Sequence, residues 1–382
     1  MTHAERRLRH CMVVHGYYPD PRVEREARAL VEAGYAVDVV ALRDAGDPPV
    51  EEPEPGLVVR RVPLGRRRGR GALAQLGEYV AFLGLALVEV GRLHVTRRYD
   101  SVQVHNLPDF LILAALVPRI DGAGLILDLH DLMPEFAASR FGWPIDGRLV
   151  RLVRLQERLS CRLADRVVTV SDHWAATLVE RGVPAERLFV LMNLPDPALW
   201  SVPERDRGVP DGPLRLIYHG TLVERYGVDL AIRAVAVARE DADVRLHVHG
   251  WGERLPSLVE LARRLGLGDA VEFSTERLPT RGLARLVAGA DVGLVPYRRD
   301  VFTDGILPTK LMEYALLGMP AIVTRTPAIE RLFDESMVRF VPGDDVDALA
   351  EAIVELARRP DLRAALGQGI RRFAERHRWE EA

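Results

Sequence analysis

Short apolar runs alternate with helical patterns along almost all of the 382 residues. The runs are rich in β-branched residues and about five residues long, which is typical of parallel strands covered on both faces. In the first half they cover residues 11–15, 36–42, 57–62, 101–105, 125–129, 166–170 and 189–192. In the second half they cover residues 214–219, 244–249, 270–274, 292–295, 321–324 and 338–341. The pattern between them predicts helices, for example over residues 22–33 with Gly34 as a left-handed cap.

One proline-rich segment interrupts this alternation. Its residues that disfavour regular structure are Pro195, Pro197, Pro203, Gly208, Pro210, Gly212 and Pro213. Strand–helix alternation on both sides implies right-handed crossovers, so we predict an α/β fold with two Rossmann-like, doubly wound parallel-sheet domains facing across a cleft. The predicted parts are a first domain (1–195), a linker (196–213), a second domain (214–370) and a C-terminal segment (371–382) that could return to the first domain.

Composition and charge exclude several classes of protein. The formal net charge of −3 provides no overall attraction to nucleic acid. Two cysteines, Cys11 and Cys161, are too few for a disulfide framework or a zinc cluster, so we expect a cytoplasmic protein. The longest apolar run, residues 79–88, is half a membrane span, and we predict that no helix crosses a bilayer.

The segment around Lys310 carries the strongest chemical signal. Lys310 is the single lysine among 52 lysine and arginine residues. We predict that Thr309 caps a helix running to residue 317, whose free N–H groups and Lys310 would favour an anion. Glu313 lies three residues further on the same helix face, where its carboxylate could accept hydrogen bonds from two ribose hydroxyls. The pair fits a nucleoside-diphosphate ligand, although an ordinary surface ion pair would have the same spacing.

Two glycine-containing loops follow predicted strands of the second domain. Residues 220–227 begin with Gly220 and include Arg225, which could reach a phosphate leaving group. Residues 250–252 form a Gly-x-Gly loop between Gly250 and Gly252, and such loops are also found as simple turns. Together they favour a ligand site at the strand ends of this domain.

These motifs resemble glycosyltransferase family four, the retaining group 1 glycosyltransferases of GT-B architecture. The resemblance spans almost the whole chain and rests on the motifs at residues 19–27, 128–135, 170–171, 193–196, 220–227, 250–252 and 308–320. It implies a hydroxyl acceptor on the first domain, a nucleotide-sugar donor on the second, and transfer with retention. The sequence differs from the family pattern at three positions. Thr221 and Tyr226 occupy positions where many members have arginine and lysine, and Gly305 replaces a glutamate.

The resemblance also assigns candidate site residues. The predicted catalytic residues are His130, Arg225 and Lys310. The predicted nucleotide-sugar contacts are Gly220, Thr221, Gly250, Gly252, Asp304, Gly305, Ile306, Leu307 and Glu313. The predicted acceptor-side residues are Gly16, Tyr18, Asn106 and Glu135. The alternative for His130 is a structural role, in which its imidazole forms a hydrogen bond with a neighbouring carboxylate.

No metal or other cofactor is predicted. Asp128 and Asp131 flank His130 but do not form an Asp-x-Asp arrangement. Arg225, Lys310 and the helix N-terminus would therefore have to neutralise the leaving group.

Arginines are concentrated in two parts of the first domain. Nine of them lie between residues 60 and 98, around an apolar helix candidate at residues 73–93. A second helix carries Arg148, Arg151, Arg154, Arg158 and Arg162, opposite Leu149, Leu152, Leu159 and Leu163. This pattern suits an anionic membrane surface, at about 1 kcal/mol per basic residue, and a peripheral location at the inner face of the membrane. A solvated helix face is the alternative, because the chain uses arginine almost exclusively.

Two other functions are compatible with the sequence. A nucleotide-sugar epimerase has a similar two-domain shape but needs no acceptor. A catalytically silent nucleotide-sugar-binding subunit would explain the departures at Thr221, Tyr226 and Gly305.

Overall fold

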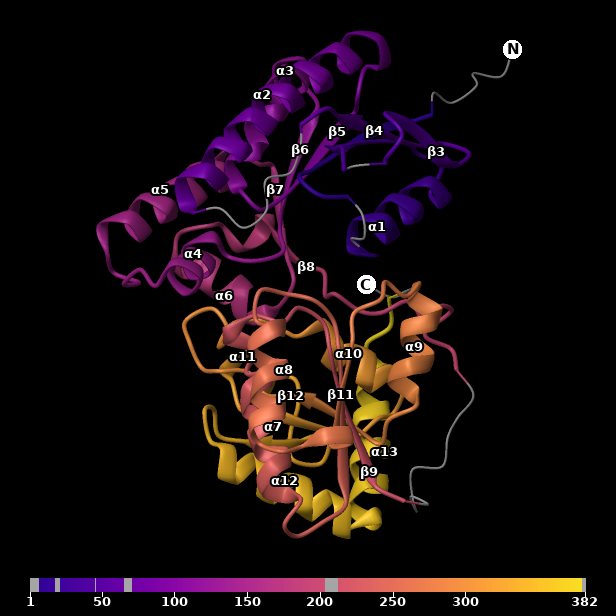
Figure 1. The fold of residues 1–382 in the computed structure, drawn as a ribbon. Helices are drawn as coiled ribbons and strands as arrows, with labels where there is room; N and C mark the ends of the chain where they lie inside the picture. The colour runs from indigo at the N-terminus through magenta and orange to yellow at the C-terminus, as the bar shows by residue number, and fades with distance from the viewer. Residues whose placement is uncertain (1–6, 18–20, 45, 65–70, 203–211, 380–382) are drawn as a thin grey trace. The chain divides into compact units, whose positions relative to one another are not determined.

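The computed structural model describes residues 7–17, 21–44, 46–64, 71–202 and 212–379. The chain divides into two compact units, Met1–Leu191 and Met192–Ala382. In each unit helices pack on both faces of one twisted sheet (Figure 1). The division lies four residues before the predicted end of the first domain, and Leu194 and Trp200 are buried within the second unit.

The first unit contains, among its described residues, a sheet in the order β3-β4-β2-β1-β5-β6-β7-β8. The strands are β1 (Arg9–Val14), β2 (Ala36–Leu42), β3 (Val50–Glu54), β4 (Leu57–Val62), β5 (Ser101–His105), β6 (Gly124–Leu129), β7 (Arg166–Thr169) and β8 (Leu188–Val190). All neighbours pair in parallel except β3 and β4, which form an antiparallel edge pair. β3 was not predicted, because its sequence, VEEPE, is mostly exposed and lacks an apolar pattern.

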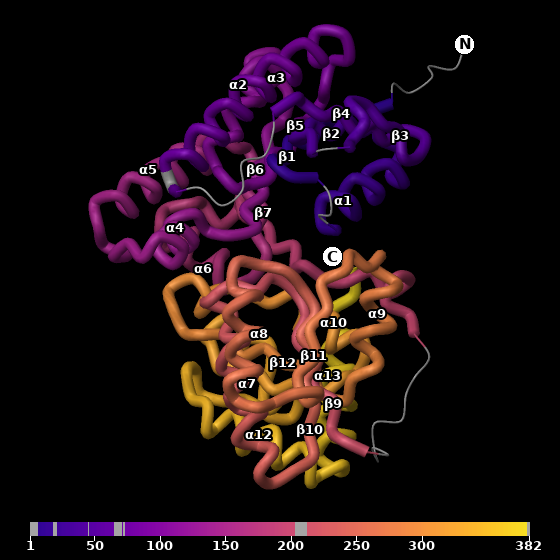
Figure 2. The backbone as a smooth tube through the Cα atoms, in the orientation of Figure 1, coloured from indigo at the N-terminus to yellow at the C-terminus, as the bar shows by residue number. Residues whose placement is uncertain are grey.

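The helices of the first unit lie on both faces of this sheet (Figure 2). They are α1 (Pro21–Glu32), α2 (Ala72–Arg97), η1 (Asp109–Ala115), α3 (Leu116–Ile120), α4 (Met133–Phe141), α5 (Arg148–Leu163), α6 (Asp172–Glu180) and η2 (Ala185–Arg187). α1 covers one face, and α2, α3 and α5 lie on the other (Figure 1). The chain leaves β1 toward β2 on one side and reaches β5 on the other, so the carboxyl ends of β1 and β5 flank the switch point of the sheet.

Helix α2 is longer than the apolar run at residues 79–88 suggested. By length and composition it is long and apolar enough to cross a membrane. Its side chains Phe82, Ala86 and Val90 are nevertheless buried within the first unit, while Leu73 and Val88 are exposed. This helix therefore has one face in the protein core and an apolar face outside it.

The second unit has a parallel sheet in the order β11-β10-β9-β12-β13-β14. The strands are β9 (Leu214–His219), β10 (Val244–His249), β11 (Val271–Ser274), β12 (Val292–Val295), β13 (Ala321–Thr324) and β14 (Arg339–Val341). Its helices are η3 (Glu224–Tyr226), α7 (Val228–Ala238), α8 (Leu255–Arg264), η4 (Gly268–Ala270), α9 (Thr280–Ala288), α10 (Thr309–Leu316), α11 (Pro327–Glu330), α12 (Val346–Arg358) and α13 (Pro360–Arg376). α7, α8 and α12 lie on one face of the sheet, with α9, α10 and α13 on the other (Figure 1).

Two local predictions differ from the structure of this unit. Pro308, rather than Thr309, is the N-cap of α10, and no side chain caps this helix. Proline suits this position because it has no N–H to satisfy and a fixed φ near the helical value. The predicted C-terminal segment begins at residue 371, which lies inside α13, a helix that packs against α10.

Candidate active site

Three loops of the second unit lie at the carboxyl ends of adjacent strands. Residues 220–227 follow β9, residues 250–254 follow β10, and residues 296–308 connect β12 to α10. The chain moves from β9 to β10 on one side and reaches β12 on the other, so β9 and β12 flank the switch point. Open α/β sheets bind ligands at this point, and here the fold brings the predicted donor residues together.

Lys310 is buried in a cage of three tyrosines at this switch point. Its Nζ donates a hydrogen bond of 2.8 Å to the hydroxyl of Tyr297. The same nitrogen lies 4.8 Å, 5.2 Å and 4.9 Å from the ring centroids of Tyr218, Tyr226 and Tyr297. Tyr226 and Tyr297 stack on each other at 4.6 Å. Aromatic faces attract a cation without cancelling its charge, so the ammonium group keeps its capacity for an anion.

Burial lowers the pKa of Lys310 from 10.5 to about 8, and Glu313 partly opposes the shift. Desolvation disfavours the charged form of an amine, which explains the direction of this shift. Lys310 is also close to the glycine loop, because a Cβ placed on Gly220 would lie 3.5 Å from its Cε. The predicted cation therefore lies beside the start of the predicted loop, and it contacts that loop through the Tyr226 ring.

Glu313 lies one turn along α10 from Lys310 and is partly exposed. Its Oε2 lies 3.2 Å from Nε2 of His219, the last residue of β9. Burial, together with Lys310 and His249, holds the pKa of His219 well below 6.5, so this imidazole is neutral at pH 7. A neutral imidazole leaves the negative charge of Glu313 in place, as a carboxylate acceptor requires.

Arg225 and Thr221 lie on the loop after β9. The Arg225 guanidinium stacks over the ring of Phe302 at 5.3 Å, next to the segment that leads to α10. Thr221 is exposed, and its carbonyl accepts a hydrogen bond from the Tyr218 hydroxyl. Arg225 is thus placed beside the loop that precedes Lys310.

The loop before α10 holds the remaining predicted donor contacts. Asp304 forms a bidentate ion pair with Arg299, with both N–O distances 2.7 Å. Gly305, Ile306 and Leu307 are buried. A sugar contact by Asp304 would therefore compete with Arg299.

Gly250 and Gly252 have a structural reason for being glycine. A Cβ on Gly250 would lie 1.9 Å from the carbonyl oxygen of Gly220, and one on Gly252 would lie 2.2 Å from that of Leu222. The backbones of the two loops are joined by hydrogen bonds from Gly220 and Leu222 to the carbonyls of His249 and Trp251, both 2.9 Å. These glycines allow close packing of the loops, and this packing positions Gly220 against Lys310.

His130 belongs to a buried polar network in the first unit. Its Nε2 lies 3.0 Å from Nδ1 of His105 and 3.5 Å from Oδ2 of Asp128. Asp128 also accepts two hydrogen bonds from Arg22, of 3.1 Å and 2.9 Å. Burial opposes ionisation of Asp128, but Arg22 and His130 outweigh it and hold the pKa of the carboxyl well below 3.8. His130 is therefore oriented through carboxylate and imidazole partners.

The same network extends to Glu26 and Gln103. The Arg22 guanidinium lies 3.0 Å from Glu26, and Gln103 donates to Glu26 over 2.6 Å and to Asp128 over 3.2 Å. Burial, followed by repulsion from Asp128, raises the pKa of Glu26. Arg22, Glu26 and Gln103 are not among the predicted site residues, since their spacing along the chain does not reveal that α1, β5 and β6 meet here.

The predicted acceptor-side residues have different surroundings. Asn106 accepts a hydrogen bond from the His130 N–H over 2.9 Å and donates to the Asp131 carbonyl over 2.6 Å, so it holds the loop that carries His130. Gly16 follows β1 and is partly exposed, and Tyr18 lies outside the described residues. Glu135 is buried and pairs with Arg181, which also pairs with Glu157. In this structure Glu135 therefore serves as an ion-pair partner of Arg181.

His105, Asp128 and His130 lie close enough together to offer three metal-ligand atoms. In the described structure these atoms contact one another, and Asp128 is bound in a bidentate manner by Arg22. This arrangement is a hydrogen-bonded network stabilised by an arginine.

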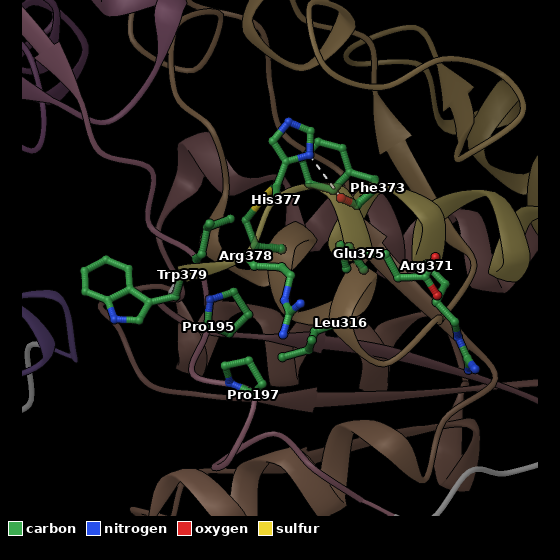
Figure 3. Close-up of a pocket in the computed structure, with 13 residues that line it drawn as sticks. Pro195, Pro197, Leu316, Arg371, Phe373, Glu375, His377, Arg378 and Trp379 are labelled. Atoms are coloured by element: carbon green, nitrogen blue, oxygen red, sulfur yellow. Dashed lines mark hydrogen bonds between the residues drawn. The ribbon is translucent and has the colours of Figure 1, made fainter. Parts of the chain in front are cut away.

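A pocket of about 220 Å³ lies beside α10 (Figure 3). Met312, Ala315 and Leu316 of α10 line it, together with Pro195 and Trp379. These helix positions are spaced so that they point away from the tyrosine cage. The pocket is therefore separate from the candidate donor site.

The tyrosine cage was not predicted. Tyr226 enters the sequence prediction only as a departure from the family, and Tyr218 only as part of the predicted strand at residues 214–219. Tyr297 comes from a different loop, and the sequence carries no signal that the three rings meet around one lysine.

Comparisons with solved structures define the class. Sucrose-phosphate synthase from Thermosynechococcus elongatus superposes with a TM-score of 0.77 at 19% identity, covering 98% of this chain and 96% of that one. Anabaena HepE in complex with UDP-glucose gives a TM-score of 0.69 at 17% identity, covering 97% and 95%. The fold is the GT-B architecture with two Rossmann-like domains, as predicted.

Sequence comparisons identify the family. The Glycosyl transferase 4-like domain matches residues 19–194, and the Glycosyl transferases group 1 domain matches residues 213–359. The chain therefore belongs to glycosyltransferase family four, and it is a nucleotide-sugar-dependent glycosyltransferase.

Two relatives indicate the range of this family. D-inositol 3-phosphate glycosyltransferase 1 of Catenulispora acidiphila is 28% identical over 94% of this chain and 87% of its own length. The GDP-mannose-dependent alpha-(1-6)-phosphatidylinositol monomannoside mannosyltransferase of Mycolicibacterium smegmatis is 32% identical over 63% of this chain and 65% of its own length. The acceptors for which the two relatives are named differ.

Proposed function

We propose that this protein is a metal-independent retaining glycosyltransferase that moves a sugar from a nucleoside-diphosphate sugar to a hydroxyl of a lipid-linked or polysaccharide acceptor. The second unit binds the donor and the first unit binds the acceptor. The observation that carries the proposal is Lys310, a buried cation held by tyrosine rings beside the loop that begins at Gly220.

Charge balance supports independence of a metal. Departure of a nucleoside diphosphate leaves negative charge on its terminal phosphate. Lys310, Arg225 and the N-terminus of α10 can stabilise this charge, and such stabilisation is worth most where water is excluded. We therefore expect full transfer activity after exhaustive treatment with EDTA; loss of activity that added Mg²⁺ restores would contradict this part of the proposal.

Glu313 provides the second donor contact. A carboxylate one helical turn from Lys310 can accept hydrogen bonds from two ribose hydroxyls while the ammonium holds the phosphates. The neutral state of His219, 3.2 Å away, supports this role.

The names of two relatives suggest acceptors to test. One is named for D-inositol 3-phosphate and the other for phosphatidylinositol monomannoside, and both of these compounds contain inositol. We therefore propose D-inositol 3-phosphate and phosphatidylinositol mannoside as the first acceptors to test, followed by oligosaccharide fragments of envelope polysaccharides.

The decisive experiment is a panel of UDP-, GDP- and dTDP-sugars incubated with the purified full chain. Slow hydrolysis of one donor, with faster turnover when an acceptor is added, is the expected result. An isomerised nucleotide sugar would identify an epimerase instead, and binding without turnover would identify a silent subunit. The anomeric configuration of the product, read by NMR, tests retention.

A further inference from the structure

Helix α5 exposes a stripe of leucines on the surface of the first unit. Leu149, Leu152, Leu155, Leu159 and Leu163 are between 39% and 63% exposed. Their spacing of three and four residues places them on one side of the helix. The buried side of α5 is instead formed by Val150, Glu157, Ser160 and Cys161. The leucines therefore lie on the exposed surface of α5 and outside the core of the first unit.

Arginines adjoin the leucine stripe on the exposed surface of α5. Arg148, Arg151, Arg158 and Arg162 are exposed, and within the described part of the chain none of them forms an ion pair. The one acid of this helix, Glu157, is buried and pairs with Arg181, while Asp146 precedes the helix. The exposed side of α5 is thus apolar and cationic at once.

Two surface arginines of the second unit are instead paired with nearby acids. Arg263 forms two hydrogen bonds of 2.8 Å with Glu260, and Arg359 forms one of 2.8 Å with Asp361. On α5, by contrast, exposed arginines without an ion pair to any described residue lie beside exposed leucines.

A second helix extends the apolar surface. α2 and α5 both pack against η1, on the same face of the first sheet (Figure 1). The outer side of α2 exposes Leu73, Leu76, Val80 and Val88. Because Phe82 and Val90 of α2 are buried within the first unit, the helix is part of the folded unit and lies along it.

We infer that the leucine and arginine face of α5, with the outer side of α2, binds the surface of an anionic lipid bilayer. Leucines of an interfacial helix enter the boundary between headgroups and acyl chains, and arginines at its edge pair with lipid phosphates. Charge complementarity selects this occupant, since a second copy of this chain would bring the same uncompensated arginines into contact with their own kind. The first unit would then be peripheral at a membrane and able to meet a lipid-linked acceptor.

The test is flotation of the full chain with vesicles of phosphatidylcholine alone or mixed with phosphatidylglycerol, over a series of salt concentrations. We expect binding to the anionic vesicles that weakens as salt rises, because salt screens the arginines. No binding at low salt would overturn the inference. Since the readout is lipid binding, failure here leaves the donor-hydrolysis test of the proposed function unaffected.

Two triple variants separate the two components. Leu152→Gln/Leu155→Gln/Leu159→Gln should lower the partition coefficient at least about tenfold at every salt concentration, because it removes apolar area. Arg151→Gln/Arg158→Gln/Arg162→Gln should lower it at least about tenfold at low salt and flatten the salt dependence. All six side chains are exposed, so circular dichroism should show an unchanged fold.

Matched variants of the second unit serve as controls. Val237→Gln/Val259→Gln/Leu265→Gln removes exposed apolar side chains, and Arg245→Gln/Arg281→Gln/Arg285→Gln removes exposed charges. Both should bind vesicles within about twofold of the original chain, since neither touches α5 or α2. Equal losses of vesicle binding in these control variants would overturn the inference. It would also be overturned if the original chain did not bind vesicles and instead formed a dimer, detected by light scattering, that the leucine substitutions dissociate.

Discussion

The two units each bury one strongly basic side chain at a switch point, but they compensate it differently. In the first unit Arg22 contacts two carboxylates, Asp128 at 2.9 Å and Glu26 at 3.0 Å. In the second unit Lys310 contacts a tyrosine hydroxyl at 2.8 Å and three aromatic faces. The first cation is neutralised within the protein, and the second is only desolvated.

This difference separates a structural charge from an available one. A buried ion pair with good hydrogen bonds uses its charge to hold neighbouring strands and side chains in register. A buried ammonium group surrounded by aromatic rings has a pKa lowered by burial, and it still attracts an incoming phosphate because the rings carry no net charge. The contrast predicts that removal of the Arg22 side chain mainly lowers the stability of the first unit, whereas removal of the Lys310 side chain mainly lowers the rate of transfer.

The largest effect is expected from Arg22→Met. Removing one partner of a buried pair leaves Asp128 and Glu26 uncompensated, so the first unit should lose about 3–5 kcal/mol of stability. Hydrogen exchange of peptides from β5 and β6 during urea unfolding would measure it unit by unit. Arg28→Met is the control, because its partner Glu24 is exposed and the expected loss is below about 1 kcal/mol. Equal losses in both variants would refute the structural role of Arg22.

Lys310→Ala and Glu313→Ala should each lower transfer by at least about 100-fold with little change in stability, because they remove contacts to developing charge and to ribose. Steady-state transfer rates and thermal unfolding give the two readouts. Arg264→Ala and Glu351→Ala, at exposed positions of the same unit, should leave the rate nearly unchanged. Near-normal turnover in both site variants would rule out the donor assignment.

The pH dependence should distinguish the two cations. Lys310 is protonated below its pKa of about 8 and loses its charge above it, so kcat/KM for the donor should fall as pH rises through 8, by about tenfold per unit. Arg22 stays charged throughout, because a guanidinium does not titrate in this range. In the Lys310→Arg variant, kcat/KM for the donor should therefore not fall above pH 8, even if the variant is less active than the original protein. A flat profile up to pH 10 in the unmodified protein would contradict the lowered pKa.

The smallest effect is expected from Tyr297→Phe. This change keeps the aromatic face but removes the hydroxyl that accepts the Lys310 hydrogen bond, so it disfavours the charged form. Activity at pH 7 should fall only a few-fold, as is usual for the loss of one neutral acceptor, while the alkaline limb moves to lower pH. Tyr35→Phe in the first unit should leave the limb unchanged; a shift toward higher pH in Tyr297→Phe would show that the hydroxyl does not stabilise the ammonium.

Much of this architecture could be predicted from local patterns. Seven of the strand segments named at the outset, including residues 101–105 and 214–219, have the same bounds in the structure. Apolar runs of this kind determine strands because both faces of a parallel sheet are covered. The family followed from the order of motifs along the chain, and Lys310 was distinguished by being the single lysine.

What the tertiary structure alone decided are the contacts between segments distant in sequence. Tyr218, Tyr226 and Tyr297 meet around Lys310 because β9 and β12 are neighbours, and Arg22 meets Asp128 because β1 and β6 both flank β5. The same holds for α5, whose periodicity shows that leucines and arginines lie on different sides. Periodicity is a property of one helix, whereas burial depends on which side the rest of the fold covers. Here the fold covers Val150 and Cys161, and the leucines remain outside.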